Sequence, residues 1–335
     1  MRRLLLLLPA LLLTLVCAGP AHAKPVLGIA DQKASTFDDP RLDALHLKYA
    51  RYYLSWDVLS DKHSLREADA WFAGAKKDGM QPVVTIARSR IPSKIRQKPT
   101  PAKLVAELKK WRKRWGSSTI KTISTWNEAN VANHPEYYAS LWVALRKGCT
   151  GCTVLGADLL DDPQVLDWTT KFVAYTKKHG GKQPTVWGLH AYNDANTFKT
   201  TITKALLKGL KGDIWITETG GVASRPRPGY TFAGCGAAFQ AKATSYLLNT
   251  IAKLSPRIKR IYIFNWGLGS NDASFDSALI DAENRERPAL NVIRKYLGQA
   301  QVTNPLFGVS PGPKPCKYKG SKNAKAPAAP KKKKS

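Results

Sequence analysis

Eight short apolar or β-branched segments alternate with eight longer amphipathic segments, and this alternation predicts an α/β fold, a single (β/α)8 TIM barrel. Residues 24–309 are also close in length to the ~250 residues typical of one such barrel. No Gly-x-Gly-x-x-Gly turn follows the first short segment, which argues against an open, doubly wound sheet that binds a dinucleotide.

The expected strands and helices follow one another in regular order. We expect strands at residues 25–31, 50–56, 81–87, 121–126, 153–158, 185–192, 213–219 and 260–266. We expect helices in the gaps and after the last strand, at residues 39–47, 64–79, 101–116, 134–148, 163–180, 197–210, 237–254 and 287–298. Several helices carry signals for their ends, with Pro101 near a start and Gly79, Gly116 and Gly148 near stops.

Residues 1–23 have the pattern of a cleavable export signal. They begin with two arginines, continue as a short leucine-rich run, and end in the small-x-small pattern AHA. The apolar run is shorter than the roughly 20 residues that a membrane-spanning helix needs, and no later segment is long and apolar enough to cross a bilayer. We therefore expect a secreted, monomeric protein that starts at Lys24 and is extracellular or associated with the cell wall.

Export also sets the redox compartment, so the four cysteines that survive cleavage are expected to form disulfides. Four cysteines permit three connectivities. Of these we favour Cys149–Cys152 together with Cys235–Cys316. A zinc site at the close pair is the alternative, but it needs further ligands, and the other two cysteines do not form a second close pair.

The chain is strongly basic, with 53 Lys and Arg against 24 Asp and Glu and a net charge of +29. Residues 310–335 are rich in Pro, Ala and Lys, and we expect them to form a disordered tail. The tail is either a solubilising end or a tether to polyanions of the cell envelope. Export, and the lack of an RNP-type or helix-turn-helix pattern, favour envelope polymers or acidic glycans over nucleic acid as partners.

Polar and aromatic residues stand at the ends of the expected strands, where (β/α)8 barrels carry their active sites. They are Asp31, Arg51, Asn127, Glu128, Asp158, His190, Tyr192, Glu218 and Trp266. Glu128 ends the fourth strand and Glu218 ends the seventh, so closing the barrel brings both carboxyls to one cleft. Hydrolysis of a glycoside with retention uses two carboxyls ~5–5.5 Å apart, one as nucleophile and the other as acid and then base.

Five motifs in this order resemble one group of enzymes. They are TWNEAN, GLHAYND, WITETGG, FNWG and SALIDAENRERPALNVI, spread over most of residues 25–298. Together they are similar to the clan A (β/α)8 retaining glycoside hydrolases, which place Asn-Glu after strand four and Glu after strand seven. Overall, the chain is similar to the family of β-xylosidases and α-L-iduronidases. Ala129 departs from the pattern, because many relatives carry Pro there, and this should alter the loop more than the chemistry.

The resemblance implies a role for each site residue. Glu128 would protonate the leaving oxygen and later deprotonate water, and Glu218 would attack the anomeric carbon. Asn127 would bind the sugar 2-hydroxyl. For the acid role we expect burial and the charge of Glu218 to raise the pKa of Glu128. The implied mechanism requires no cofactor and no metal.

The remaining strand-end residues are expected to support these three. Arg51 and Tyr192 would orient Glu218, His190 would support the sugar or Glu128, Trp266 would face a sugar ring, and Asp31 would bind hydroxyls. Four of them have an alternative. For Arg51 it is an interior cation, and for His190 a packed histidine. For Trp266 it is a core tryptophan, and for Asp31 a cap. For the whole chain, the alternative is a secreted barrel without catalysis that binds anionic glycans or the cell wall.

Two basic segments follow expected strands and should therefore lie on the catalytic face. They contain Arg88, Arg90, Lys94 and Arg96 after strand three, and Arg225 and Arg227 after strand seven. A cleft lined by one sign of charge concentrates ligands of the opposite sign. We therefore expect an oligo- or polysaccharide substrate that is anionic; the alternative is that these loops never touch the substrate.

Overall fold

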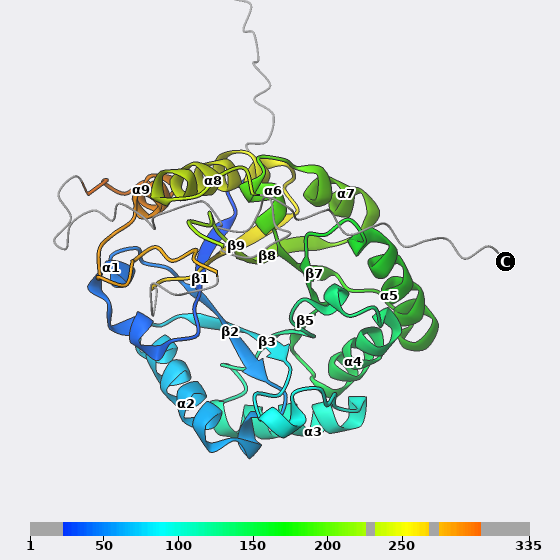
Figure 1. Cartoon of the computed structure of the whole chain (residues 1–335). Coiled ribbons are helices and arrows are strands. Elements are labelled where there is room, and N and C mark those ends of the chain that lie inside the picture. Colours follow the sequence, from blue (N-terminus) through cyan, green and yellow to red (C-terminus); the bar gives the residue numbers. More distant parts are fainter. Residues whose placement is uncertain (1–22, 226–231, 268–274, 303–335) are drawn as a thin grey trace, which may run out of the picture.

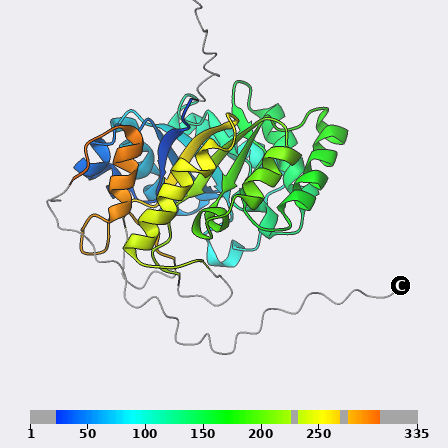
Figure 2. The same cartoon turned by 90° about the horizontal axis from the view of Figure 1, so that it is seen from above.

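A computed structural model describes residues 23–225, 232–267 and 275–302 of the chain. Its parallel strands form a barrel that helices surround (Figure 1), which confirms the predicted fold class. Figure 2, at right angles to this view, shows that the helices run alongside the strands. The expected export signal and tail lie almost entirely outside the described residues and stay predictions. No helix within the described ranges has the length and apolarity that a bilayer span requires.

The sheet has nine parallel strands. They are β1 Val26–Ala30, β2 Tyr49–Ser55, β3 Gln81–Ala87, β4 Thr122–Ser124, β5 Thr153–Leu155, β6 Asp158–Leu160, β7 Val186–His190, β8 Asp213–Thr219 and β9 Ile258–Phe264. Their order in the sheet is β5-β4-β3-β2-β1-β9-β8-β7-β6. Because all strands run the same way, every strand ends on the same side of the barrel.

The prediction of one continuous strand over residues 153–158 is wrong, because the chain divides there into β5 and β6. β5 pairs with β4, whereas β6 pairs with β7. The step between them closes the barrel, since the amide of Gly156 donates to Val186 (2.9 Å) and that of Asp158 donates to Trp126 (2.9 Å). A Cβ at Gly156 would lie 2.6 Å from the Trp187 ring, so only glycine fits at the step.

The helices match the expected ones with shifted ends. They are α1 Pro40–Asp43, α2 Lys62–Lys77, α3 Pro101–Trp115, α4 Pro135–Gly148, α5 Val165–Gly180, α6 Tyr192–Asn196, α7 Thr201–Gly209, α8 Ala237–Asn249 and α9 Pro288–Leu297. The first is much shorter than predicted, and a 3-10 turn at Ala34–Asp38 precedes it. The short helix α6 was not predicted, because Tyr192 was assigned to the strand before it and residues 193–196 to the loop before the next helix.

Local chemistry explains the helix boundaries. The Asp61 carboxylate accepts hydrogen bonds from two backbone amides in the first turn of α2. In α3, Thr100 caps the start, Pro101 follows it, and Gly116 adopts a positive φ of 96° just beyond the end. Buried residues recur along α3 at Leu104, Leu108 and Trp111, so one face of the helix packs on the barrel.

The barrel interior has an apolar layer below a polar one. Ala30, Val83, Leu155, Trp215 and Tyr262 form the buried apolar cluster. Arg51 and Thr85 stand two residues further along β2 and β3 than Tyr49 and Val83, and both are fully buried. Since alternate residues of a strand point to the same side, β2 and β3 carry the interior from apolar to polar toward their ends.

The disulfide Cys149–Cys152 is present, which confirms the first predicted pair. It closes the four-residue turn 149–152 between α4 and β5, and Arg112 Nη1 lies 2.9 Å from the Cys152 sulfur. Cys316 lies outside the described residues, so its pairing with Cys235 stays a prediction.

Gly188→Ala should destabilise the barrel. A Cβ at Gly188 would lie 2.0 Å from Asp158 Oδ1 and 2.8 Å from Thr217 Oγ1, both on buried side chains. We expect a loss of roughly 1–3 kcal/mol in the free energy of unfolding, as for other overpacked cores. Gly209→Ala in α7 is the control, because only Leu166 approaches its Cβ, at 3.3 Å. Urea denaturation measures both, and equal midpoints would contradict the prediction.

Candidate active site

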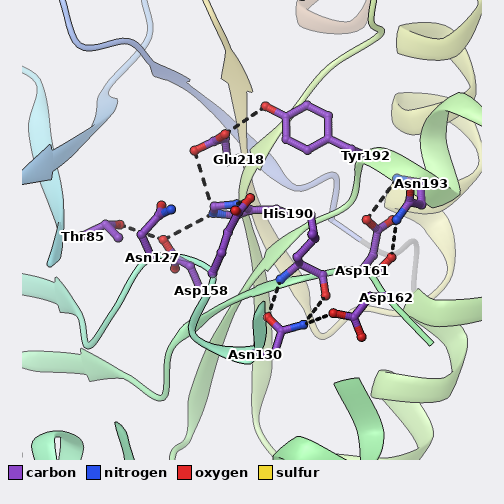
Figure 3. A network of polar contacts seen from close by, with 12 residues as sticks. Thr85, Asn127, Asn130, Asp158, Asp161, Asp162, His190, Tyr192, Asn193 and Glu218 are labelled. Carbon is purple, nitrogen blue, oxygen red and sulfur yellow. Dashed lines mark hydrogen bonds and ion pairs between the residues drawn. The ribbon is translucent and has the colours of Figure 1, made fainter. Parts of the chain in front are cut away.

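The polar strand ends converge inside the mouth of the barrel (Figure 3). Arg51 lies on β2, Asp158 begins β6, His190 ends β7 and Glu218 is the sixth residue of β8. Asn127 and Glu128 follow β4; Glu128 is the residue before a 3-10 turn at Ala129–Val131. Because the strands are parallel, residues far apart in the sequence meet at this one end.

Arg51 is the centre of the arrangement and is fully buried. Its Nη1 donates to Glu218 Oε2 (2.6 Å), and its Nη2 donates to Asn127 Oδ1 (2.7 Å) and Asp158 Oδ2 (2.8 Å). Its Nε donates to Thr85 Oγ1 (2.9 Å). Burial disfavours the guanidinium charge, but the charges of Asp158 and Glu218 outweigh it and raise the pKa of Arg51.

Asp158 is the buried counter-ion of this arginine. Besides Arg51, its carboxylate accepts hydrogen bonds from Thr85 Oγ1 (2.7 Å) and Ser124 Oγ (2.6 Å). Burial alone would raise the pKa of Asp158, but Arg51 and His190 outweigh burial and hold it well below its ordinary value. The carboxylate is therefore ionised and fixes the guanidinium in place.

His190 lies between the two glutamates. Its Nδ1 is 3.1 Å from Glu128 Oε1, and its Nε2 is 3.9 Å from Glu218 Oε2 and 3.5 Å from Asp158 Oδ2. Burial opposes a charged imidazole, and so does Arg51, 3.2 Å from Nε2. The charge of Glu218 and the hydrogen bonds to Asp158 and Glu128 outweigh both and raise the pKa of His190 to about 9.

Glu128 adopts a left-handed backbone conformation with φ 47°, which turns the chain sharply after β4. Its side chain is 33% exposed. Burial raises the pKa of this carboxyl, but the hydrogen bond and charge of His190, aided by Arg51, lower it below the ordinary value. The sequence-based expectation of a raised pKa for Glu128 is therefore wrong, because it omitted the cation that the fold places beside the carboxylate.

Glu218 is held from two sides. Arg51 donates to Oε2 at 2.6 Å, and the Tyr192 hydroxyl donates to Oε1 at 3.0 Å. Burial, and then the charge of Glu218, raise the pKa of the Tyr192 phenol well above its ordinary value, so the phenol keeps its proton as a donor. The Glu218 side chain remains 16% exposed, so it can still reach a ligand in the mouth.

The Asn127 side chain is half-buried and oriented by the same arginine. Since Arg51 Nη2 donates to its Oδ1, the amide presents its Nδ2 amino group on the other side. This leaves a hydrogen-bond donor next to the carboxylates, where an acceptor or hydroxyl of a ligand could bind.

Trp266 and Asp31, which follow the ends of β9 and β1, are both buried and are joined by a hydrogen bond. The Trp266 side chain is 3% exposed in the core, and its Nε1 donates to Asp39 Oδ2 (2.9 Å). Asp31 accepts from the backbone amides of Lys33 (2.9 Å) and Trp266 (2.7 Å). Both residues therefore hold the end of β9 against the segment after β1, which matches the core and cap alternatives.

A ring that the sequence did not single out lies next to the nucleophile candidate. Phe275 packs edge-on against Tyr192, with ring centroids 5.0 Å apart, and lies 6.3 Å from the Phe264 ring. Both phenylalanines are half-buried. The FNW motif drew attention to Trp266, but the alternation of β9 points Phe264, two residues earlier, toward the interior.

A second polar network joins the loops around the mouth (Figure 3). Asn130 donates to Leu160 O (2.9 Å) and Asp162 Oδ2 (2.6 Å), and so ties the turn after β4 to the end of β6. Asp161 accepts from the amides of Asn193 (3.0 Å) and Asp194 (2.7 Å) in α6. The paired aspartates after an expected strand end were the available signal, but only the fold gives them partners.

The basic loops are only partly free to meet a ligand. Arg90 forms a close ion pair with Glu67 on α2, which turns it toward the helix. Arg88 is exposed and lies within hydrogen-bonding reach of Tyr53. Arg225 stacks over the Phe275 ring, 5.5 Å from its centroid. Arg227 lies outside the described residues. Within the described ranges, no three His, Cys, Asp or Glu side chains are grouped to hold a metal ion.

Solved structures with this architecture include several glycosidases. The chain is similar to a psychrophilic glycoside hydrolase family 10 endo-β-1,4-xylanase, with 12% identity and a TM-score of 0.61 over 81% of this chain and 96% of that one. It is also similar to fungal β-1,4-galactanases, with 15% identity and a TM-score of 0.61 over 82% of this chain and 100% of that one. At such identities the likeness shows the fold alone.

The sequence matches no curated protein. Residues 99–287, however, match the family described as glycosyl hydrolase catalytic core. This stretch contains Asn127, Glu128, His190 and Glu218, and so spans both candidate carboxylates. Because the match covers more than half of the 335 residues, the chain belongs to the glycosyl hydrolase catalytic core family.

Proposed function

We propose that this protein is a secreted O-glycoside hydrolase that works by retention, with Glu218 as nucleophile and Glu128 as acid and base. The observation that carries the proposal is the position of His190, whose two ring nitrogens face the two glutamates. One imidazole between two carboxylates places them on opposite sides of a single small space. Two carboxyls about 5–5.5 Å apart are what double displacement needs.

In the first step, a Glu218 oxygen attacks the anomeric carbon and the glycosidic bond breaks. The leaving oxygen takes the proton of Glu128, so the alcohol departs neutral and the sugar stays as an ester of Glu218. In the second step, Glu128 removes a proton from water, the water oxygen attacks the same carbon, and the ester bond breaks. Glu218 leaves as a carboxylate and Glu128 holds its proton again.

The proton for the first step is held by Glu128 and His190 together. At neutral pH the imidazole, with a pKa of about 9, is charged and donates to Glu128. Moving that proton along the 3.1 Å contact converts the pair to a neutral imidazole and a protonated carboxyl. A sugar that excludes water from the mouth favours the neutral pair, because desolvation penalises charges.

Arg51 and Tyr192 have the opposite task at Glu218. Both donate to its carboxylate, and this fixes the direction in which the nucleophile points. The Asn127 amino group is placed to bind a hydroxyl of the sugar. Phe275 supplies an apolar ring beside Tyr192, and Phe264 lies next to that ring, as aromatic side chains do in many ligand pockets.

The proposed substrate is an oligo- or polysaccharide, and an anionic one is supported by Arg88 and Arg225 near the mouth. Secretion is proposed from the N-terminal segment alone. The alternative, a barrel that only binds anionic glycans or cell wall, would keep a fold of this kind without needing two carboxylates around one histidine. Turnover of chromogenic glycosides by the mature protein separates the two functions.

Glu218→Gln should abolish turnover of a chromogenic glycoside panel, with kcat falling by ~10³-fold or more, because the nucleophile is lost. Glu128→Ala should still form the ester with substrates that have good leaving groups but lose the base of the second step, so turnover should fall and azide should restore it as a glycosyl azide. Glu107→Gln on α3 is the control, since among the described residues that carboxylate pairs with Lys110 alone. Inverted anomeric configuration in the product, followed by NMR, would contradict these roles.

His190→Gln should move the alkaline limb of the kcat/KM profile to lower pH. The pKa of His190 is raised to about 9, so the wild-type pair keeps its proton below that pH and loses it as the pH rises through about 9. Without the imidazole only the Glu128 carboxyl holds the proton, so we expect a shift of roughly two units or more. NMR titration of the imidazole checks the assignment independently. A limb that stays at about pH 9 in the variant would refute it.

Phe275→Ala should raise KM several-fold, because it removes an apolar ring next to Tyr192. Trp266→Phe serves as the comparison. It deletes a buried indole and its hydrogen bond to Asp39, so it should lower the free energy of unfolding by roughly 1–3 kcal/mol and change KM less. If Trp266→Phe raises KM more than Phe275→Ala does, the assignment of the sugar-facing ring is reversed.

A further inference from the structure

The end of the barrel opposite the mouth carries a cluster of lysines, which we call the basic face. It consists of Lys113, Lys147, Lys178 and Lys208 in the last turns of α3, α4, α5 and α7, and of Lys121 and Lys211 in the loops before β4 and β8. All six side chains are exposed. The four helices are neighbours around the barrel (Figure 1), so their ends form one sector.

These lysines have no carboxylate partner among the described residues, whereas the arginines beside them are used inside the protein. Arg112 donates to Ile120 O (2.7 Å) and Arg146 to Gly180 O (2.9 Å). Arg114 pairs with Asp69. The arginines at these helix ends thus make the hydrogen bonds within the protein, and the charged ends of the lysines face solvent.

Acidic residues are nearly absent from the same sector. Among the described residues, the last turns of α3, α4, α5 and α7 and the loops that follow them contain no carboxylate, and Asp213 comes next as the first residue of β8. Glu136 and Asp167 lie in the first turns of α4 and α5, at the other end of the helices. The helix dipole favours a cation at the C-terminal end of each helix, but it does not account for the two further lysines in loops. The six lysines of the basic face carry the same charge and therefore repel one another.

A recess opens beside this face. It has a volume of ≈ 390 Å³ and is lined by Lys76 and Lys121, by the hydroxyl residues Ser118 and Thr119, and by the chain around Met80. Ammonium and hydroxyl donors around one hollow suit an anionic group that enters from solvent. The recess therefore gives the basic face a place where one unit of a polymer could be held.

We propose that the basic face binds a polysaccharide that carries carboxylates, and so docks the enzyme on its substrate matrix. Charge complementarity argues for a polyanion, and lysines, as compact point charges without a fixed fork, suit repeated charges along a flexible chain. The choice of polysaccharide over nucleic acid rests on the proposed function. Because the face is opposite the mouth, a docked chain leaves the catalytic cleft open to another stretch of the same matrix.

The test compares two variants of the full chain that each lose three positive charges. The face variant carries Lys147→Gln, Lys178→Gln and Lys208→Gln. The control carries Lys62→Gln, Lys199→Gln and Lys204→Gln, all exposed and none among the six lysines of the face; Lys204 lies one turn before Lys208 in α7. Urea denaturation first establishes that both are folded. Affinity for immobilised polygalacturonate is then measured by biolayer interferometry from ~50 to ~200 mM salt.

The face variant should bind polygalacturonate about tenfold more weakly than the wild type at the lower salt, with a shallower salt dependence, and the control should change by less than about threefold. Equal losses in both variants would overturn the assignment to this face. Equal binding of polyphosphate or DNA by the wild type would overturn the choice of a carboxylated glycan. Since binding is measured without turnover, a protein that docks but hydrolyses no glycoside refutes only the proposed function.

Discussion

The buried ion pair of Arg51 with Asp158 is the constraint on which the mouth of the barrel depends. Both side chains are completely buried and lie 2.8 Å apart. Taking one such charge away typically costs about 3–5 kcal/mol, because the other is left uncompensated. The guanidinium has donors to spare after this pairing, and it uses them on Glu218 and Asn127. One satisfied pair inside the barrel thus fixes two residues that face the substrate side.

The same pair decides the protonation of the rest of the site. Three carboxylates, Glu128, Asp158 and Glu218, surround the single cation Arg51, which leaves an excess of negative charge. His190 balances that excess, and its raised pKa follows from this imbalance despite complete burial. In the proposed mechanism, the proton for the first step is therefore stored on a histidine beside Glu128, whereas a solitary buried glutamic acid would have to hold it by desolvation alone.

The two ends of the barrel differ in what their charges do. At the mouth, opposite charges meet in hydrogen-bonded contact and most are buried. At the other end, lysines stand in solvent and the nearby arginines bond to backbone carbonyls. Arg forks hold fixed oxygen acceptors well, whereas the ammonium group is strongly hydrated and stays mobile. All strands end at the mouth and the helices between them end at the opposite side, and this order separates the paired charges of the mouth from the lysines.

Much of the fold and of the candidate site could be predicted from the sequence. The alternation of segments determined the barrel, and the strand ends determined that Glu128, Glu218, Arg51, His190 and Tyr192 would meet, because parallel strands finish at one edge. These features follow from local sequence or from strand order, so predicting them requires no distance between atoms.

Other features were decided only by tertiary packing. Residues 153–158 divide into two strands because β5 pairs with β4 and β6 pairs with β7. The lowered pKa of Glu128 depends on an imidazole 62 positions away, and Trp266 is buried where its indole donates to Asp39. The sequence alone determined that Glu128, Glu218 and the three residues around them meet at the mouth. Their pKa shifts and exposure depend on distances of a few ångströms, and only the closed barrel sets those distances.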